Sequence, residues 1–286
     1  MADHLLDQDI RLDCVLPLSS IRLAAMAWGG AAGRPVLALH GWLDNAASFA
    51  RLAPLLPDWR IVALDLAGHG HSEHRPAGYR YHLIDYVFDV IAAAEALGWS
   101  QFTVMGHSLG AAIAGLVAVA LPERVERLLL IDGLGPLSEA AEQAPQRLRH
   151  AVAELSQDRR ALRRYPDLHT LVLARQRATG LSYDAARVLI ERATWRSDQG
   201  VMWRSDGRLR QTTPLYMTEP QVIALLSAIE CPTTLVLANQ GGVRQRPTLM
   251  ERIAAIPQLH LIPLDGGHHL HLERASAVAD VFAGAR

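Results

Sequence analysis

A five-residue segment, Gly-His-Ser-Leu-Gly at 106–110, constrains the fold more than any other part of the chain. The residues before it, 102–105, are apolar and favour a strand, and small apolar residues follow it as far as Pro122, as in a buried helix. Glycines on both sides of Ser108 let the strand and the helix approach without Cβ clashes. The pattern therefore predicts a sharp strand-to-helix turn, with the Ser108 hydroxyl above a sheet and near a helix N-terminus that favours negative charge.

Strand-like and helix-like stretches alternate on both sides of this turn, which predicts an α/β protein with helices on the faces of a parallel sheet. The first two strands are expected to pair antiparallel. The expected strands cover residues 10–16, 21–28, 36–39, 60–64, 102–105, 127–131, 234–238 and 260–263. The expected helices cover residues 45–56, 83–97, 109–121, 221–229 and 249–256.

The alternation is interrupted between residues 137 and 214, where arginine is dense and runs of β-branched residues are missing. Residues 146–155 and 185–195 have the apolar spacing of helices, and a short hairpin is predicted around 202–207. We therefore predict a core formed by residues 1–136 and 215–286, with a helical cap formed by residues 137–214.

The charged residues exclude several classes of function. All 28 basic residues are arginine, because the chain contains no lysine. Schiff-base and pyridoxal chemistry and the phosphate-binding P-loop all need a lysine amine, so these classes are excluded. With 29 acidic residues the net charge is -1, which gives no electrostatic reason to expect nucleic acid or a membrane as partner. We expect a small-molecule substrate and no cofactor or metal.

The cysteines and the N-terminal residues bear on the expected location. Cys14 and Cys231 have neither the spacing of a disulfide framework nor that of a metal site, which fits a reduced compartment. Residues 1–4 lack the basic and apolar character of a secretory signal, and the most apolar run, 109–121, is too short to span a bilayer. A cytoplasmic protein is expected.

Four blocks of sequence carry a family resemblance: His-Gly-Trp-Leu-Asp-Asn at 40–45, Asp-Leu-Ala-Gly-His-Gly-His-Ser at 65–72, the turn at Ser108, and Gly-His at 267–268. In this order and spacing the chain resembles the α/β-hydrolase superfamily over nearly its whole length, and it is most similar to the serine hydrolase-like proteins. The resemblance implies a mostly parallel sheet of about eight strands, with a helical cap inserted after the sixth strand. It also implies a serine hydrolase that cleaves a carboxylic ester or thioester through an acyl-serine intermediate.

A serine hydroxyl needs a neighbouring base to act as a nucleophile. In the family the base follows the last strand, where this chain has a histidine-rich segment. We expect His268 to be the base for Ser108, because it directly follows a glycine pair at the tip of a strand-to-helix loop. His269 is its rival, and His271 is expected to pack or to cap.

With Ser108 and His268, an acidic residue is expected to complete a catalytic triad. The position of this acid departs from the commoner family pattern. The commoner family position is the loop after strand 234–238, but residues 239–242 contain no carboxylate. The other position is the end of the strand that follows the nucleophile helix, where Asp132 stands. Asp132 would hold the tautomer of His268 and stabilise its protonated form, and a turn-capping role is the alternative. Asp265 is too close to His268 in sequence for this role.

An oxyanion hole needs two backbone N–H donors aimed at the developing charge. The resemblance assigns them to Trp42 and to Leu109, the residue after the nucleophile. His40, Gly41 and His107 flank these positions and are expected to contribute to substrate binding.

Two alternative functions remain. The spacing of His69, His71 and His74 superficially suits a metal-dependent hydrolase, although a polar loop of the hydrolase scaffold explains the same residues. A protein that binds a ligand on the hydrolase fold without catalysis is the second alternative, because a fold does not determine a function.

Substrate choice is expected to come from the cap, as the roof of the pocket. Five residues of the cap or just after it could line this pocket or else pack with the cap: Leu168, Leu171, Trp195, Trp203 and Tyr216. Four arginines could attract an anionic substrate or else form a solvated helix face: Arg159, Arg160, Arg163 and Arg164. The sequence leaves open the acyl and leaving groups, hydrolysis against acyl transfer, and the oligomeric state.

Overall fold

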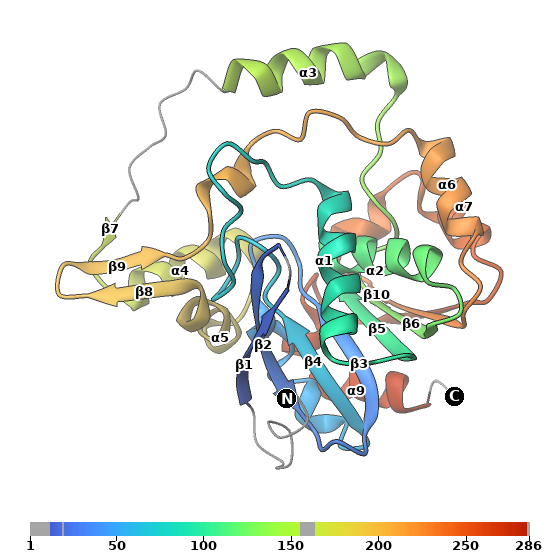
Figure 1. Cartoon of the computed structure of the whole chain (residues 1–286), viewed down its shortest axis with the longest axis horizontal. Coiled ribbons are helices and arrows are strands. Elements are labelled where there is room, and N and C mark those ends of the chain that lie inside the picture. Colours follow the sequence, from blue (N-terminus) through green and yellow to red (C-terminus); the bar gives the residue numbers. More distant parts are fainter. Residues whose placement is uncertain (1–11, 19, 155–163, 285–286) are drawn as a thin grey trace.

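An eight-stranded sheet forms the centre of the computed structural model, which describes residues 12–18, 20–154 and 164–284 (Figure 1). The strand order is β1-β2-β4-β3-β5-β6-β10-β11. Strand β2 pairs antiparallel with β1 and β4, and the other neighbours pair parallel. The strands are β1 (Leu12–Pro17), β2 (Arg22–Trp28), β3 (Arg34–Leu39), β4 (Trp59–Leu64), β5 (Phe102–His107), β6 (Val125–Ile131), β10 (Thr233–Ala238) and β11 (Leu259–Leu264). The predicted mostly parallel sheet is confirmed; residues 10 and 11 of its first strand lie outside the described part.

Two apolar layers cover the sheet, which explains why its central strands have no polar face. Every residue of β4 and β10 is buried, as expected for strands with a helical layer on each side. One layer contains α1 (Leu83–Ala96), α2 (Leu109–Ala120), α6 (Glu219–Ser227) and α7 (Leu249–Ala255). The other contains the short 3-10 helices η2 (Ala46–Phe49) and η3 (Ala53–Leu55) with α8 (Leu270–Glu273) and α9 (Ala275–Gly284).

The prediction of one helix over residues 45–56 is wrong in helix type, because this segment forms the two short 3-10 helices η2 and η3. Asn45 caps η2 by accepting a hydrogen bond from the backbone N–H of Ala47. Pro54 has no N–H to continue a helical ladder, so the first turn cannot extend through it. The apolar spacing was correct, since these residues pack on the sheet.

Between β6 and β10 the chain leaves the sheet and forms a separate group of elements. These are η4 (Ala141–Gln143), α3 (Ala144–Ala153), β7 (Arg164–Tyr165), α4 (Leu168–Thr179), α5 (Tyr183–Ala193), β8 (Thr194–Ser197), β9 (Gly200–Trp203) and η6 (Gly207–Arg210). Figure 1 shows α4, α5 and the small sheet beside one another at the left of the large sheet, with α3 apart from them at the top. We refer to residues 137–214 as the cap segment.

The cap segment contains a three-stranded sheet, β7-β9-β8, that the sequence patterns did not predict. The predicted helix over 185–195 ends at Ala193, because Thr194 is already extended and begins β8. The hairpin lies before the predicted position 202–207, with its turn near Gly200. The positive φ of Gly200, 111°, suits a tight turn that a larger residue would resist.

Buried ion pairs join the cap segment to the core. Arg192 of α5 donates from Nε to both carboxylate oxygens of Asp65, at 2.9 and 3.1 Å, and from Nη1 to Asp13 at 2.5 Å. Arg175 of α4 forms a second pair with Asp44, which follows β3. Since one arginine in each pair comes from the cap segment and the acids come from the core, both pairs fix the position of α4 and α5.

None of the helices in the described ranges combines the length and the apolar character needed to cross a bilayer. The apolar helix α2, for example, has 12 residues and rises only about 18 Å.

Candidate active site

Ser108 alone makes the turn between β5 and α2, in a backbone conformation that residues other than glycine rarely adopt. Its φ is 52° and its ψ is -110°. A Cβ at Gly106 would overlap the backbone of Gly110, and a Cβ at Gly110 would overlap the carbonyl at the end of β3. The turn leaves Ser108 partly exposed, and its hydroxyl makes no capping hydrogen bond to α2. Backbone strain of this kind is typical of functional positions.

Asp132 and His268 meet although 136 residues separate them in the chain. Nδ1 of His268 lies 2.6 Å from Oδ2 of Asp132, a hydrogen-bond distance typical of a charged partner. Asp132 is wholly buried, and its other oxygen accepts a hydrogen bond from the N–H of Ala238 at 3.1 Å. The His268 side chain is 34% exposed. The carboxylate of Asp132 is therefore held by a backbone N–H as well as by His268. Nε2 of the imidazole, on the opposite side of the ring from this contact, remains available to act as a base.

The structure separates the two rival histidines. His269 is buried, and its Nε2 lies 3.2 Å from Oδ2 of Asp44, so the nitrogen that a base would use already has a partner. No hydrogen bond joins the Ser108 hydroxyl to the His268 ring within the ranges that the structure describes. Such contacts are often loose in a ligand-free enzyme and tighten with substrate. The arrangement favours His268 over His269 as the base.

Leu109 and Trp42 are the residues whose backbone N–H groups are expected to form an oxyanion hole. Leu109 is the first residue of α2, where N–H groups have no partner within the helix. Trp42 follows the end of β3; its ring is half exposed, and its Nε1–H donates to the carbonyl of Leu209 in the cap segment at 3.1 Å. Both residues lie at the carboxyl ends of adjacent parallel strands, β3 and β5. Their role as donors stays a prediction.

The three flanking residues have mainly structural contacts. His40 is buried; its Nδ1–H donates to the carbonyl of Gly41 at 2.7 Å, and its Nε2 accepts from the N–H of Leu66 at 3.0 Å. Burial lowers the pKa of His40, so its ring is neutral. Gly41 lies against His107, where a Cβ would come within 2.9 Å of Nδ1. His40 and His107 are wholly buried, so any effect of theirs on a substrate is through the shape of the loops.

Two residues of this region were missed by the sequence reasoning. Asp44 is buried and contacts His269, and its other oxygen bonds to Arg175 of α4. Its place in the block 40–45, which carries the family resemblance, was the available signal. Nothing distinguished Arg175 from the other arginines of the chain.

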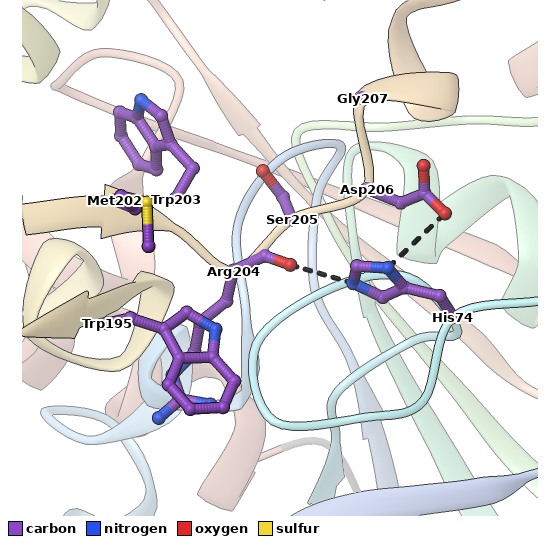
Figure 2. Close-up of a pocket in the computed structure, with 8 residues that line it drawn as sticks. All are labelled: His74, Trp195, Met202, Trp203, Arg204, Ser205, Asp206 and Gly207. Atoms are coloured by element: carbon purple, nitrogen blue, oxygen red, sulfur yellow. Dashed lines mark hydrogen bonds and ion pairs between the residues drawn. The ribbon is translucent and has the colours of Figure 1, made fainter. Parts of the chain in front are cut away.

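The three histidines of the metal alternative do not form a ligand cluster. His69 is buried and bonds to the carbonyl of Ala67 at 3.1 Å, whereas His71 and His74 are exposed. Figure 2 shows both nitrogens of His74 directed to the cap segment: Nε2 lies 2.8 Å from the carbonyl of Arg204, and Nδ1 lies 3.4 Å from Asp206. The loop is therefore a contact with the cap segment, in agreement with the scaffold interpretation.

A pocket of about 540 Å³ lies at this contact (Figure 2). It is lined by His74 and by residues of β8, β9 and the segment after β9, and neither Ser108 nor His268 belongs to the lining. Two of the predicted pocket residues, Trp195 and Trp203, line it, and Arg204 stacks on the ring of Trp195 at 4.0 Å. The pocket is thus a feature of the cap segment and its contact with the core, and not of the turn at Ser108.

The other predicted cap residues have different surroundings. Leu171 is fully buried and Leu168 packs against the same apolar cluster of the cap segment, so both belong to its packing. The guanidinium of Arg147 stacks on Tyr216 at 3.8 Å. Arg164 is exposed and bonds to Gln199, as expected of a solvated position. Arg159, Arg160 and Arg163 lie outside the described residues.

Comparison with known proteins decides the family. The profile of the alpha/beta hydrolase fold matches residues 34–275. The chain belongs to the alpha/beta hydrolase family. Within the family it is 35% identical to a serine hydrolase-like protein of Danio rerio over 93% of this chain and 85% of that protein. It is 30% identical to human serine hydrolase-like protein 2 over 91% of this chain and 89% of that protein.

Solved structures with the same overall fold agree with this assignment. The crystal structure of a hypothetical protein of Pseudomonas aeruginosa PAO1 superposes with a TM-score of 0.91 at 46% identity, covering 95% of this chain and 98% of that one. The thioesterase domain from the curacin biosynthetic pathway superposes with a TM-score of 0.86 at 26% identity, covering 96% and 99%. The α/β-hydrolase fold and the likeness to serine hydrolase-like proteins, both expected from the sequence, are confirmed.

Proposed function

We propose that this alpha/beta hydrolase is a serine hydrolase that cleaves a carboxylic ester or thioester through an acyl-serine intermediate. The observation that carries the proposal is the 2.6 Å contact between His268 and the buried Asp132, next to the strained turn of Ser108. A nucleophile, a base and an acid are thus supplied by the ends of β5, β11 and β6.

In the acylation step Ser108 attacks the carbonyl carbon and His268 takes the hydroxyl proton at Nε2. Asp132 keeps the other proton on Nδ1 and stabilises the imidazolium as it forms. The negative oxygen of the tetrahedral intermediate would accept hydrogen bonds from the N–H groups of Trp42 and Leu109. Collapse of this intermediate breaks the bond to the alcohol or thiol, which leaves with the proton from His268.

In the deacylation step a water molecule takes the place of the leaving group. His268 removes its proton, the resulting hydroxide attacks the acyl carbonyl, and the same two N–H groups bind the new oxyanion. Ser108 recovers its proton when the acid product leaves. The strained turn supports both steps, since it keeps the serine oxygen directed away from its own helix.

The thioester alternative has a specific support. The thioesterase domain from the curacin pathway matches almost the whole chain, whereas the serine hydrolase-like relatives carry no substrate in their names. An alkyl ester and a thioester of the same acyl group separate the two possibilities, because only the leaving atom differs. A panel of p-nitrophenyl esters of graded chain length, with matching thioesters, measures the preferred acyl length.

A fluorophosphonate probe tests the covalent step without knowledge of the substrate. We expect wild-type protein to be labelled and Ser108→Ala to remain unlabelled, with His268→Gln labelled at least about 10³-fold more slowly because the serine loses its base. Circular dichroism of the two variants serves as the folding control. A wild-type protein that does not react, or equal labelling of S108A, contradicts the proposal.

A further inference from the structure

A second histidine–aspartate contact lies behind the proposed catalytic pair. Oδ2 of Asp44 lies 3.2 Å from Nε2 of His269 and 3.7 Å from Nδ1 of His107. These histidines are the chain neighbours of His268 and Ser108. All three side chains of this cluster are at most 5% exposed. One buried carboxylate therefore contacts the residue next to the base and the residue next to the nucleophile.

The two histidines are also linked directly to the base. Nε2–H of His107 donates to the carbonyl of His268 at 2.9 Å, and the two rings are 4.6 Å apart between centroids. The ring centroids of His107 and His269 are 5.0 Å apart. A rotation of the His107 ring would thus break its hydrogen bond to the backbone that carries His268.

The tautomer of His107 determines how its ring interacts with the charged carboxylate of Asp44. Because Nε2 carries the donated proton, a neutral His107 ring presents a lone pair at Nδ1. Burial and the neighbouring histidines lower the pKa of His107 well below its usual value, so the ring stays neutral. The lone pair then faces the carboxylate, an unfavourable contact unless the carboxylate charge is compensated elsewhere.

Arg175 of α4 provides this compensation from the cap segment. Its guanidinium donates to Oδ1, the oxygen of Asp44 that does not face the histidines, and its side chain is only 15% exposed. Burial would raise the pKa of Asp44, but His269 and Arg175 together hold it well below its usual value. Asp44 is therefore charged, and the cation that balances it comes from the cap segment.

A metal ion is a less suitable occupant of this cluster. Single ligand atoms of Asp44, His107 and His269 lie within 4.8 Å of one another. Arg175 already binds the carboxylate and neutralises it, so a divalent cation would add uncompensated positive charge to a buried site.

We propose that Asp44 and Arg175 are a positioning pair through which the docked cap segment aligns the catalytic residues. Asp44 orients His269 by accepting its Nε2–H and packs against His107, and through these two rings it positions the loops that carry His268 and Ser108; Arg175 makes this possible by balancing the carboxylate. The inference rests on the proposed hydrolase function for its catalytic consequence. The ring orientations themselves can be tested without any substrate.

The kinetic test is a cycle of Arg175→Gln, Asp44→Asn and the double variant, assayed with the best p-nitrophenyl ester of the panel. R175Q leaves a buried carboxylate unbalanced, and we expect kcat to fall by about 10- to 100-fold with KM little changed. Adding D44N to R175Q removes the charge and is expected to restore part of kcat. Arg187→Gln, which breaks an exposed ion pair with Glu191 in the cap segment, is the matched control and should behave as wild type.

The spectroscopic test uses ring ¹⁵N chemical shifts of the histidines, which report tautomer and protonation. In R175Q we expect the signals of His107 and His269 to shift, while those of His150, exposed on α3 beside Glu154, stay unchanged. If R175Q does not fold, Arg175→Lys is used; it keeps a cation but lacks the planar guanidinium, and it should show the same changes to a smaller degree.

The outcomes separate this inference from the proposed hydrolase function. Shifted ring signals in a protein that no fluorophosphonate labels would retain the positioning pair and reject the hydrolysis. Normal labelling with unshifted signals, or a loss confined to KM without recovery in the double variant, would overturn the inference, since Arg175 would then contact the substrate or nothing catalytic.

Discussion

Replacing Gly241 by alanine tests the acid of the proposed triad by steric means, without changing a charged residue. Gly241 has φ -81° and ψ 148°, a conformation that alanine adopts without strain. Its Cβ, however, would lie 2.8 Å from Oδ1 of Asp132 and nearer still to Oδ2, the oxygen that contacts His268. The substitution therefore pushes mainly on the carboxylate, although the new Cβ would also come within 2.9 Å of Cβ of Ala238.

The size of the effect follows from these distances. A carbon and an oxygen in ordinary contact are about 3.3 Å apart, so the new methyl overlaps Asp132 by at least about 0.5 Å. Moving the carboxylate by that amount or more weakens its 2.6 Å contact with His268. Misplacement on this scale costs about 10²-fold in rate, and complete loss of the acid costs about 10⁴-fold. We expect kcat to fall within this range, with at most about 1–3 kcal/mol lost from stability through overpacking.

The assay is the fluorophosphonate labelling rate together with kcat on the best p-nitrophenyl ester. Gly242→Ala is the matched control, because no atom lies within 4 Å of the position that its Cβ would occupy. Thermal unfolding of both variants shows whether the fold is retained. A folded G241A with the kcat of G242A would refute the reasoning, since the carboxylate of Asp132 would then not need its position.

Three further predictions concern the acid, the buried histidines and the attachment of the cap segment. Asp132→Asn should lower kcat by about 10⁴-fold, measured on the same ester. Burial lowers the pKa of His69 and of His271 to about 3, against about 6.5 when unfolded, so the unfolded chain binds more protons between these values. The free energy of unfolding should therefore increase between pH 5 and pH 6.5 and decrease as the pH falls. The measurement is the urea midpoint, which should be higher at pH 6.5 than at pH 5. Arg192→Gln leaves the buried Asp65 without its cation and should cost about 3–5 kcal/mol in the free energy of unfolding.

Each of these has a control and a contrary result. Asp265→Asn is the control for the acid, because Asp265 is exposed and bonds to Asn239; a larger loss in D265N than in D132N would reverse the assignment. A urea midpoint that does not change between pH 5 and 6.5 contradicts the neutral buried histidines. For Arg192, the exposed variant Arg187→Gln should change stability by no more than about 0.5 kcal/mol, and an equal effect of both would show that the buried pair has no special role.

The fold and the turn at Ser108 could be predicted from local sequence because local chemistry determines them. Glycines two positions from Ser108 are required by close backbone contacts, and apolar runs mark strands buried on both faces. The contact between Asp132 and His268 could also be predicted, because both residues follow strands whose carboxyl ends lie at one edge of the sheet. These predictions used periodicity and position, which the sequence displays directly.

The cap segment was harder to predict because its structure depends on long-range pairing. The strand β8 begins at Thr194 directly after a helix, and it forms a hairpin with β9. No local apolar pattern predicts this pairing. Arg175 meets Asp44 across 131 residues, and any of 28 arginines could have supplied that cation. Pairings between distant charged groups have no periodicity from which to infer them.

The contact between Gly241 and Asp132 also limits how this hydrolase could evolve. The loop after β10 and the end of β6 share one small volume, because a Cβ at Gly241 would overlap the carboxylate of Asp132 that contacts His268. An acid introduced on the loop while Asp132 remained would crowd two negative groups together, and losing Asp132 first would leave the imidazole without support. If Asp132 is the catalytic acid, as proposed, moving the acid to the loop after β10 therefore requires two coordinated substitutions, and neither single change is expected to retain full activity.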